Sequence, residues 1–163
     1  MAWEFAEGLV DEILAYLTAK LPAKLDVIDA AINDGITLAD PVEYLRRDPS
    51  VPRKSGTLPI LFAVVPQGQV TMWKETAADQ EHVLWIYLFA RATAPEDLKK
   101  RMYRYGRAIF EVLIDHHFDT STVHTWDAIG PVRFDYGPQM VAGSDAIQDV
   151  KLELTYTKLE TET

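Results

Sequence analysis

Cysteine is absent from the 163 residues of the chain. This absence excludes disulfide bridges, thiolate zinc sites and cysteine nucleophiles. Glycine is scarce, with eight residues, and neither G-x-G-x-x-G nor G-x-x-x-x-G-K occurs, which argues against nucleotide enzymes built on those loops. No run of about 18 apolar residues occurs, so no transmembrane helix is predicted. The acidic N-terminal sequence lacks the basic-then-apolar order of a signal peptide.

Basic residues are also few: the chain has 16 basic and 25 acidic residues, which gives a net charge of −9. Phosphate affinity comes from accumulated Lys and Arg, so specific nucleic-acid binding is not expected. Five bases nevertheless lie within Lys99–Arg107, and the sequence after Asp145 is acid-rich. With 48% apolar and 25% charged residues, the composition is typical of one soluble domain spanning residues 1–163.

The usual catalytic and metal-binding patterns are missing as well. His116 and His117 are adjacent, so on a helix they diverge by about 100° and do not converge on one ion. We expect them to help end a helix instead. No serine lies in a G-x-S-x-G turn, and no H-E-x-x-H occurs. The sequence therefore assigns no catalytic, cofactor-binding or metal-binding residue, and we do not expect an enzyme.

Helical periodicity is clearest in two regions. Apolar residues recur every three or four positions over 5–17, and again over 23–33, with Pro22 expected to separate two N-terminal helices. Asp40-Pro41 predicts a short helix through residues 43–45. A long helix is predicted over 95–116.

The remaining apolar segments indicate strands. Residues 147–158 alternate strictly between apolar and polar, which is typical of a strand with one buried face. The segment 82–91 is apolar on both faces, so it is either central and covered on both sides or reserves one face for another copy. The predicted fold is α+β: a mixed, mostly antiparallel sheet from 58–65, 70–74, 82–91, 132–136 and 147–158, with N-terminal helices and the long helix packed on one face.

Breaks and loops are predicted from proline, glycine and polar clusters. A turn is expected at 66–69, and interruptions are expected at 77–80 and at Gly130-Pro131. The loops 46–56 and 137–145 are expected to be mobile in the free subunit and to become ordered on assembly. A flexible tail is expected over 158–163.

Tryptophans and basic residues supply the candidate interface. Trp73 lies near a strand end and Trp126 precedes a Gly-Pro break, so each is either an interface anchor or an ordinary packed residue. The bases either contact an acidic neighbour or form a solvated face. The candidate protein-interface residues are Arg46, Arg47, Arg53, Lys54, Trp73, Lys100, Arg104, Arg107 and Trp126.

The order of the predicted elements resembles a known family over roughly residues 1–158. The elements are the N-terminal helices, the strand L-P-I-L-F-A-V-V, a hairpin, a strand ending in Ile86–Arg91, a long helix with Tyr103 and Leu113, and strands at Val132–Tyr136 and Ala146–Tyr156. This order resembles the tail-terminator and tail-completion (neck) proteins of long-tailed bacteriophages. No diagnostic motif accompanies the order.

The resemblance implies a structural role in a virion. Such proteins form a ring, commonly a hexamer, that caps the tail tube, stops its growth and joins it to the head connector. The partners it implies are other copies of the chain, the tail tube protein and a head connector or neck protein, with no membrane. The expected location is the tail or neck of the virion, and the host cytoplasm during assembly. The alternatives are another neck or tail-tube subunit, or a small enzyme or ligand-binding domain with a concave polar pocket.

Overall fold

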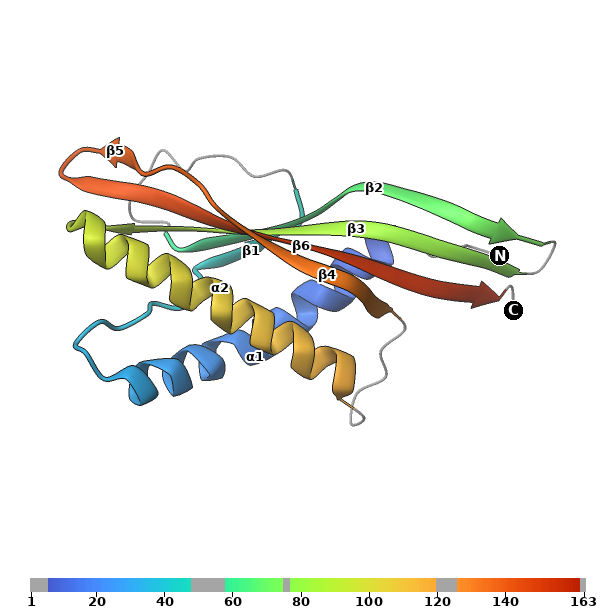
Figure 1. The fold of residues 1–163 in the computed structure, drawn as a ribbon, viewed down its shortest axis with the longest axis horizontal. Helices are drawn as coiled ribbons and strands as arrows, with labels where there is room; N and C mark the ends of the chain where they lie inside the picture. Colours follow the sequence, from blue (N-terminus) through green and yellow to red (C-terminus); the bar gives the residue numbers. More distant parts are fainter. Residues whose placement is uncertain (1–5, 48–57, 75–76, 120–125, 162–163) are drawn as a thin grey trace.

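The computed structural model describes residues 6–47, 58–74, 77–119 and 126–161. They form an α+β fold in which two helices cover one face of a six-stranded mixed sheet (Figure 1), as the sequence predicts. The elements are α1 (Ala6–Ile32), β1 (Glu43–Leu45), β2 (Ile60–Trp73), β3 (Ala77–Ala92), α2 (Pro95–Phe118), β4 (Asp127–Tyr136), β5 (Met140–Ala142) and β6 (Asp145–Thr161).

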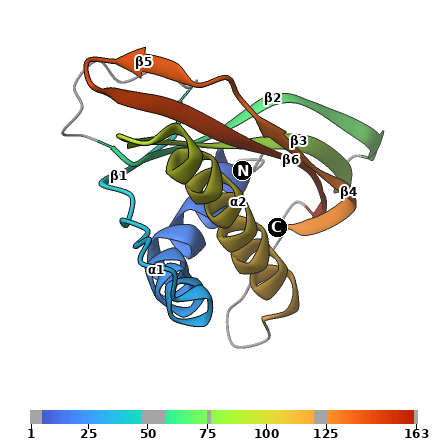
Figure 2. The same cartoon turned by 60° about the vertical axis from the view of Figure 1, so that its left-hand side comes forward.

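The sheet has the strand order β1-β2-β3-β6-β4, and β5 pairs with the start of β6. Only the β1–β2 pair is parallel, which confirms the mostly antiparallel prediction. β3 is central, between β2 and β6. Both helices lie on the same side of the sheet (Figure 2), and α2 packs on β3, β6 and β4 while α1 packs on α2 and β2.

The hydrophobic core lies between the helices and the sheet. The alternation predicted for the last strand is confirmed, because Val150, Leu152, Leu154 and Tyr156 of β6 are all buried. Leu84, Ile86 and Leu88 of β3 extend the same layer and are fully buried. Each buried side chain of this size contributes about 1.5–3 kcal/mol, so this layer dominates the stability of the fold.

The predicted boundary at Pro22 is wrong, because α1 is one helix of 27 residues that contains Pro22. An internal proline removes a backbone hydrogen bond and costs about 3 kcal/mol. Leu17, Leu21 and Leu25 are fully buried on either side of it, so the apolar stripe continues across the proline. Burial of that stripe offsets the lost hydrogen bond and keeps the two halves in one helix.

The predicted short helix at 43–45 is also wrong, because these residues form β1. Glu43–Leu45 pair with Ile60–Phe62, and the Val42 amide donates to the Pro59 carbonyl at 2.8 Å. Pairing with the edge of β2 satisfies backbone groups that a helix of a few residues leaves open. The predicted loop 46–56 lies outside the described residues from 48 onward.

The predicted turn at 66–69 and the break at 77–80 are absent, because β2 and β3 run straight through them. The register of the pair shifts between Val64 and Gln67, which accommodates Pro66. β1 pairs with β2 only as far as Phe62, so Pro66 stands on an edge strand, where a missing N–H costs little. The reversal of direction lies instead between Trp73 and Ala77.

The C-terminal third also contains more strand than predicted. β4 passes through Gly130-Pro131 with a register shift between Ile129 and Arg133. The expected loop 137–145 contains β5, and β6 continues to Thr161, so residues 158–161 are strand rather than tail. Edge strands tolerate prolines and bulges of this kind. Gly130 and Pro131 therefore do not end the pairing of β4 with β6.

The predicted long helix is confirmed as α2, which extends two residues beyond the expected end. Its buried stripe includes Leu98, Met102, Tyr105, Ile109 and Val112. Within the described residues, no helix is long and apolar enough to cross a membrane.

Candidate interaction surfaces

Three strands project beyond the helices at one end of the molecule (Figure 1). We call this projection the tongue; it consists of residues 66–73 of β2, 77–81 of β3 and 157–161 of β6. Every residue from Pro66 to Trp73 is exposed. In the described part of the chain, the outer edge of β2 has no partner strand beyond Phe62. The tongue therefore presents both side chains and unpaired backbone groups to solvent.

The base of the tongue is held by close packing of Gly68, His82 and Trp126, a cluster that we call the root of the tongue. A Cβ atom at Gly68 would lie 1.8 Å from Nδ1 of His82, so the imidazole ring lies directly on the glycine. The same ring meets Trp126 edge-on, with 5.4 Å between the ring centroids. Nε2 of His82 lies 3.1 Å from Oε1 of Gln80, which fits the neutral tautomer donating from Nε2. Burial lowers the pKa of His82, which favours this neutral form.

Trp126 therefore does not serve as the exposed anchor that one interpretation of the sequence expected. Its side chain is 0% exposed and packs under the tongue, and Lys158 lies over its ring at 5.2 Å. The alternative of ordinary packing is correct for this residue. Its position before a Gly-Pro pair suggested a loop, but the pair lies inside β4.

The tip of the tongue has the opposite character, because its apolar side chains face solvent. Trp73 is 78% exposed, and Met72 and Val70 are also exposed. Trp73 pairs with Ala78 on the face of the sheet that carries the helices, whereas Met72 pairs with Asp79 on the other face. A large aromatic side chain held this far out of the core is typical of a contact site.

A second apolar surface lies where α2 meets β4. Tyr103 and Tyr136 stack edge-on at 4.9 Å, and Phe110 and Phe134 do so at 5.7 Å. All four lie at least partly in solvent. The sequence contained a signal for this surface, because the residues at 103, 110, 114 and 118 form a second apolar stripe on the helix. We call this surface the α2–β4 groove.

The α2–β4 groove ends in a pocket of about 100 Å³ near the C-terminus of α2. The pocket is almost entirely apolar and is lined by Phe110, Leu113, Ile114, His117, Phe118, Ala128, Val132 and Leu154. Ligand pockets for drug-sized molecules are about 300–1,000 Å³, so this one has the size of a single side chain.

The face of the sheet opposite the helices carries no helix within the described residues (Figure 2). Half-buried Trp85 dominates its centre: Nε1 of Trp85 donates to Glu153 at 2.9 Å, and Nζ of Lys151 lies 4.0 Å from the indole centroid. Near β1, Phe62 and Phe89 form a small separate core on this face. The strand expected at 82–91 is confirmed as central, but within the described residues helices cover only one of its faces, so it is not covered by helices on both sides. Contact of the other face with another copy stays a prediction.

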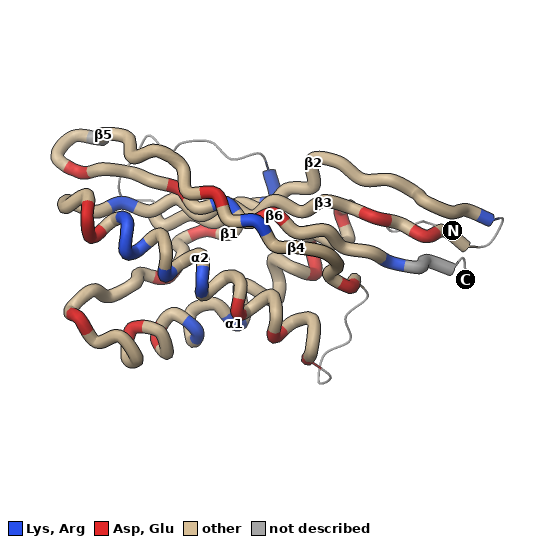
Figure 3. Tube along the Cα trace, viewed as in Figure 1, with Lys and Arg blue, Asp and Glu red and all other residues tan. Residues whose placement is uncertain are grey.

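The basic cluster on α2 is partly occupied by contacts within the chain. Figure 3 shows Lys and Arg gathered along the first half of this helix. Arg104 forms an ion pair with Asp34, which lowers the pKa of that carboxyl to about 2. Arg101 donates to the Thr37 carbonyl at 2.6 Å. These contacts hold the segment after α1 against α2.

Other candidate residues remain at the surface. Lys100 is exposed, and exposed Arg107 lies 3.0 Å from Glu111 on the next turn. Arg46 is exposed and lies 2.5 Å from Asp11 of α1. Arg47 is exposed and lies over the ring of Phe62 at 5.6 Å. Arg53 and Lys54 lie outside the described residues, so their interface role stays a prediction.

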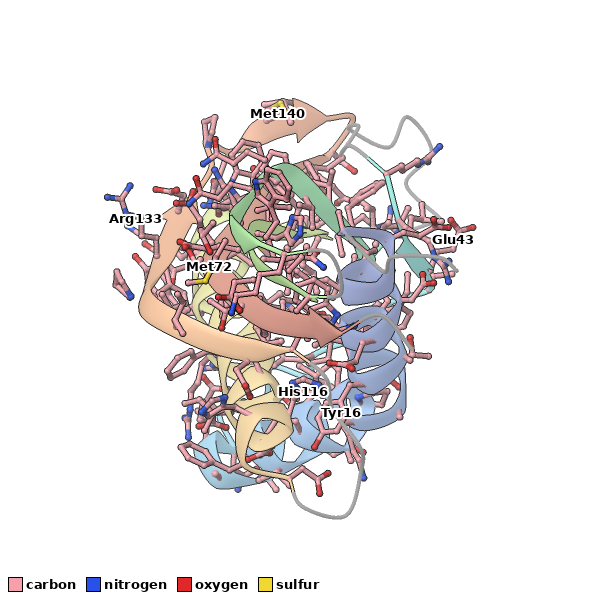
Figure 4. The ribbon with its side chains drawn as sticks, turned by 90° about the vertical axis from the view of Figure 1, so that its right-hand side faces the viewer. Tyr16, Glu43, Met72, His116, Arg133 and Met140 are labelled. Carbon is pink, nitrogen blue, oxygen red and sulfur yellow. The ribbon has the colours of Figure 1, made fainter. Side chains whose placement is uncertain are left out.

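His116 belongs to the packing between the two helices. It is buried, its Nε2 lies 3.2 Å from Oε2 of Glu12, and its ring meets that of Tyr16 at 5.0 Å (Figure 4). Burial, followed by the hydrogen bond to Asp119, raises the pKa of Tyr16 to about 12. Within the described residues, no group of three or more His, Asp or Glu side chains is placed to hold a metal ion.

A polar hollow of about 560 Å³ lies on the side of the tongue. It is lined by Thr71, Asp79, Gln80, Glu81, Asp127, Thr157 and Lys158. These residues come from four strands, and Thr71 and Asp127 are exposed. An enzyme or ligand-binding domain instead buries a few polar groups in a largely apolar pocket.

Comparisons with known proteins leave the family open. No family model matches the sequence, and no curated protein matches it. Among solved structures, the fold is similar to a chain of a structure described as "Virion of native gene transfer agent (GTA) particle". That similarity has a TM-score of 0.37 and 14% identity, and it covers 88% of this chain and 94% of that chain. At this level the likeness carries no argument about function.

Proposed function

We propose that the chain is a structural subunit of a phage-like virion that assembles into a closed ring. In this role it is a tail terminator or tail-completion protein: the ring, a hexamer, caps the tail tube and joins it to the head connector. Its partners are other copies of the chain, the tail tube protein and a connector or neck protein. It acts in the tail or neck of the particle, after assembly in the host cytoplasm.

The tongue is the observation that carries this proposal. A strand that contributes only to its own core has no need to extend eight residues, 66–73, beyond it with every residue exposed. A repeating assembly does need a rigid extension that reaches a neighbour. The packing of Gly68, His82 and Trp126 at the root supplies that rigidity.

A second apolar surface on the same molecule supports the assembly role. Ring closure requires two different surfaces on each copy, because each subunit contacts one neighbour on either side. The tongue tip and the α2–β4 groove are two such surfaces, and they lie on different elements. Exposed ion pairs contribute only about 0–1 kcal/mol each, so apolar anchors must supply most of the affinity.

The order of elements supports the more specific assignment to the tail end. An N-terminal helical segment, an antiparallel sheet, a long helix after the central strand and a closing strand are all present in the sequence order of the resemblance. The exposed bases Arg46, Arg47 and Lys100 are candidates for contact with the tube or the connector.

The assignment is tested by deleting the gene in the genome that encodes the chain and imaging the products by electron microscopy. The proposal expects unjoined heads beside tails that are overlong or lack a finished end, with normal joining restored by the gene in trans. Normal joined particles, or a defect confined to a metabolic step, contradict it. A matched complementation with Asp26→Asn, an exposed substitution on α1 away from the tongue and the α2–β4 groove, should also restore joining.

A further inference from the structure

The chain contains one Asp-Gly pair, Asp34-Gly35, in the segment that follows α1. Such a pair is prone to spontaneous isomerisation, because glycine has no side chain to shield its backbone nitrogen from the preceding carboxyl group. Around Gly35, nothing lies within 4 Å of the position that a Cβ atom would take, so the fold does not supply that shield either. The φ of Gly35 is +85°, a conformation that favours glycine, so the backbone itself calls for the residue that makes the pair reactive.

Isomerisation of such a pair passes through a five-membered succinimide ring. The backbone nitrogen of Gly35 attacks Cγ of Asp34, a bond forms between the two atoms, the nitrogen loses its proton and one carboxyl oxygen leaves as water. Water then opens the ring at either carbonyl, which gives aspartate or isoaspartate. The carboxyl group has to be protonated for its oxygen to leave as water, so the ionised carboxylate reacts poorly.

Arg104 of α2 holds both oxygens of this carboxylate. Its two terminal nitrogens donate to Oδ1 of Asp34, at 3.0 Å, and to Oδ2, a contact that we call the Arg104 fork. The Arg104 side chain is only 11% exposed, so the pair is partly shielded from water. The fork stabilises the ionised form and lowers the pKa of Asp34 to about 2. A carboxyl group whose pKa falls by more than one unit is protonated over about tenfold less often at neutral pH.

We propose that Asp34-Gly35 is a site of isoaspartate formation in this chain and that the Arg104 fork suppresses the reaction in the folded protein. Attack on Cγ turns the planar carboxylate into a tetrahedral group, which breaks the paired contacts with the guanidinium group. The product carries an extra methylene group in the backbone between α1 and β1. Arg104 therefore protects this backbone position in addition to holding the segment against α2. This chemistry is independent of the ring proposed above.

Ageing of the purified full chain tests this role. Wild type and Arg104→Gln are incubated side by side, and isoaspartate at residue 34 is measured by mass spectrometry of peptides with electron-transfer fragmentation. The product should accumulate about tenfold faster in the folded Arg104→Gln variant than in folded wild type. Wild type unfolded in urea lacks the fork and should react at least as fast as the folded variant. Adding Asp34→Glu to Arg104→Gln should abolish the product, because the longer side chain cannot form the five-membered ring.

Arg101→Gln is the matched control, because Arg101 holds the same segment through the Thr37 carbonyl, at 2.6 Å, and not through Asp34. This variant should age at the wild-type rate. Arg104→Lys keeps the positive charge without the fork, so its rate should lie between those of wild type and Arg104→Gln, and it carries the test if circular dichroism shows that Arg104→Gln is unfolded. Equal rates in folded wild type and the folded Arg104 variants overturn the inference. Equal acceleration by Arg101→Gln and Arg104→Gln, or no product in urea, overturns it as well.

Discussion

The two ends of β2 are stabilised by different kinds of contact. Ile60 to Ala63 are buried under the helices or against Phe89, whereas Pro66 to Trp73 are exposed along their whole length. The first half is therefore stabilised by the hydrophobic core between the helices and the sheet. We call this part of the molecule the body. The second half is stabilised by pairing with β3 and by a few contacts at its root. The buried end of β2 therefore serves stability, and its exposed end is the part that we propose serves recognition.

The largest expected effect comes from the body. Leu152→Ala removes a fully buried side chain from the layer under α2, so the free energy of unfolding should fall by about 2–5 kcal/mol. Urea unfolding followed by circular dichroism measures the change. Thr71→Ala on the tongue is the control and should stay within about 0.5 kcal/mol of wild type. Equal losses from the two variants would show that the body and the tongue do not differ as described.

The root of the tongue should give a smaller effect. Gly68→Ala places a Cβ atom where the His82 ring lies, so the ring must shift away from Trp126 and stability should fall by about 1–3 kcal/mol. Hydrogen exchange should become faster in the tongue before it does in the body. The neighbouring variant Gln69→Ala, whose side chain is exposed, should change neither quantity. Unchanged exchange in Gly68→Ala would rule out the packing at the root.

The pH dependence of the root follows from His82. Because burial lowers the pKa of His82, the folded chain resists a proton that the unfolded chain accepts below about pH 6.5. The free energy of unfolding should therefore fall as the pH drops from 7 to 5, by at most about 1.4 kcal/mol per pH unit from this group. His82→Gln should lose this component when unfolding is measured at each pH. An identical slope in the two proteins would show that His82 titrates normally.

The sequence predicts the body better than it predicts the tongue. The alternation of 147–158 and the stripe of the long helix follow from burial on one face, and both are confirmed. Pro66, Gly130 and Pro131 predict breaks in the strands, because their local propensities oppose strand structure. These residues lie on edge strands, where a missing N–H costs little. Which strands lie at an edge depends on the order of the whole sheet, and the local sequence does not reveal it.

The candidate surface was predictable in part. Trp73 lies exposed at a strand end, as the interface interpretation requires, and its contact with another molecule stays a prediction. Trp126 is buried because the strand order places it under His82, a contact between residues 44 positions apart. Arg104 is held by Asp34, which the sequence could not pair with it because 70 residues separate them. Contacts between residues this far apart in the sequence determine which side chains are buried or paired within the chain and which remain exposed at the surface.

The smallest effect on stability should accompany the largest effect on assembly. Trp73→Ser removes a side chain that is 78% exposed, so the free energy of unfolding should change by no more than about 0.5 kcal/mol. The direct measurement is the mass in solution, together with electron micrographs, of the purified wild-type and Trp73→Ser chains over the same concentration range. The account predicts closed rings of the wild-type chain at high concentration and only monomers of the folded variant. Identical assembly of the two chains, or a loss of assembly that only accompanies unfolding, would contradict it.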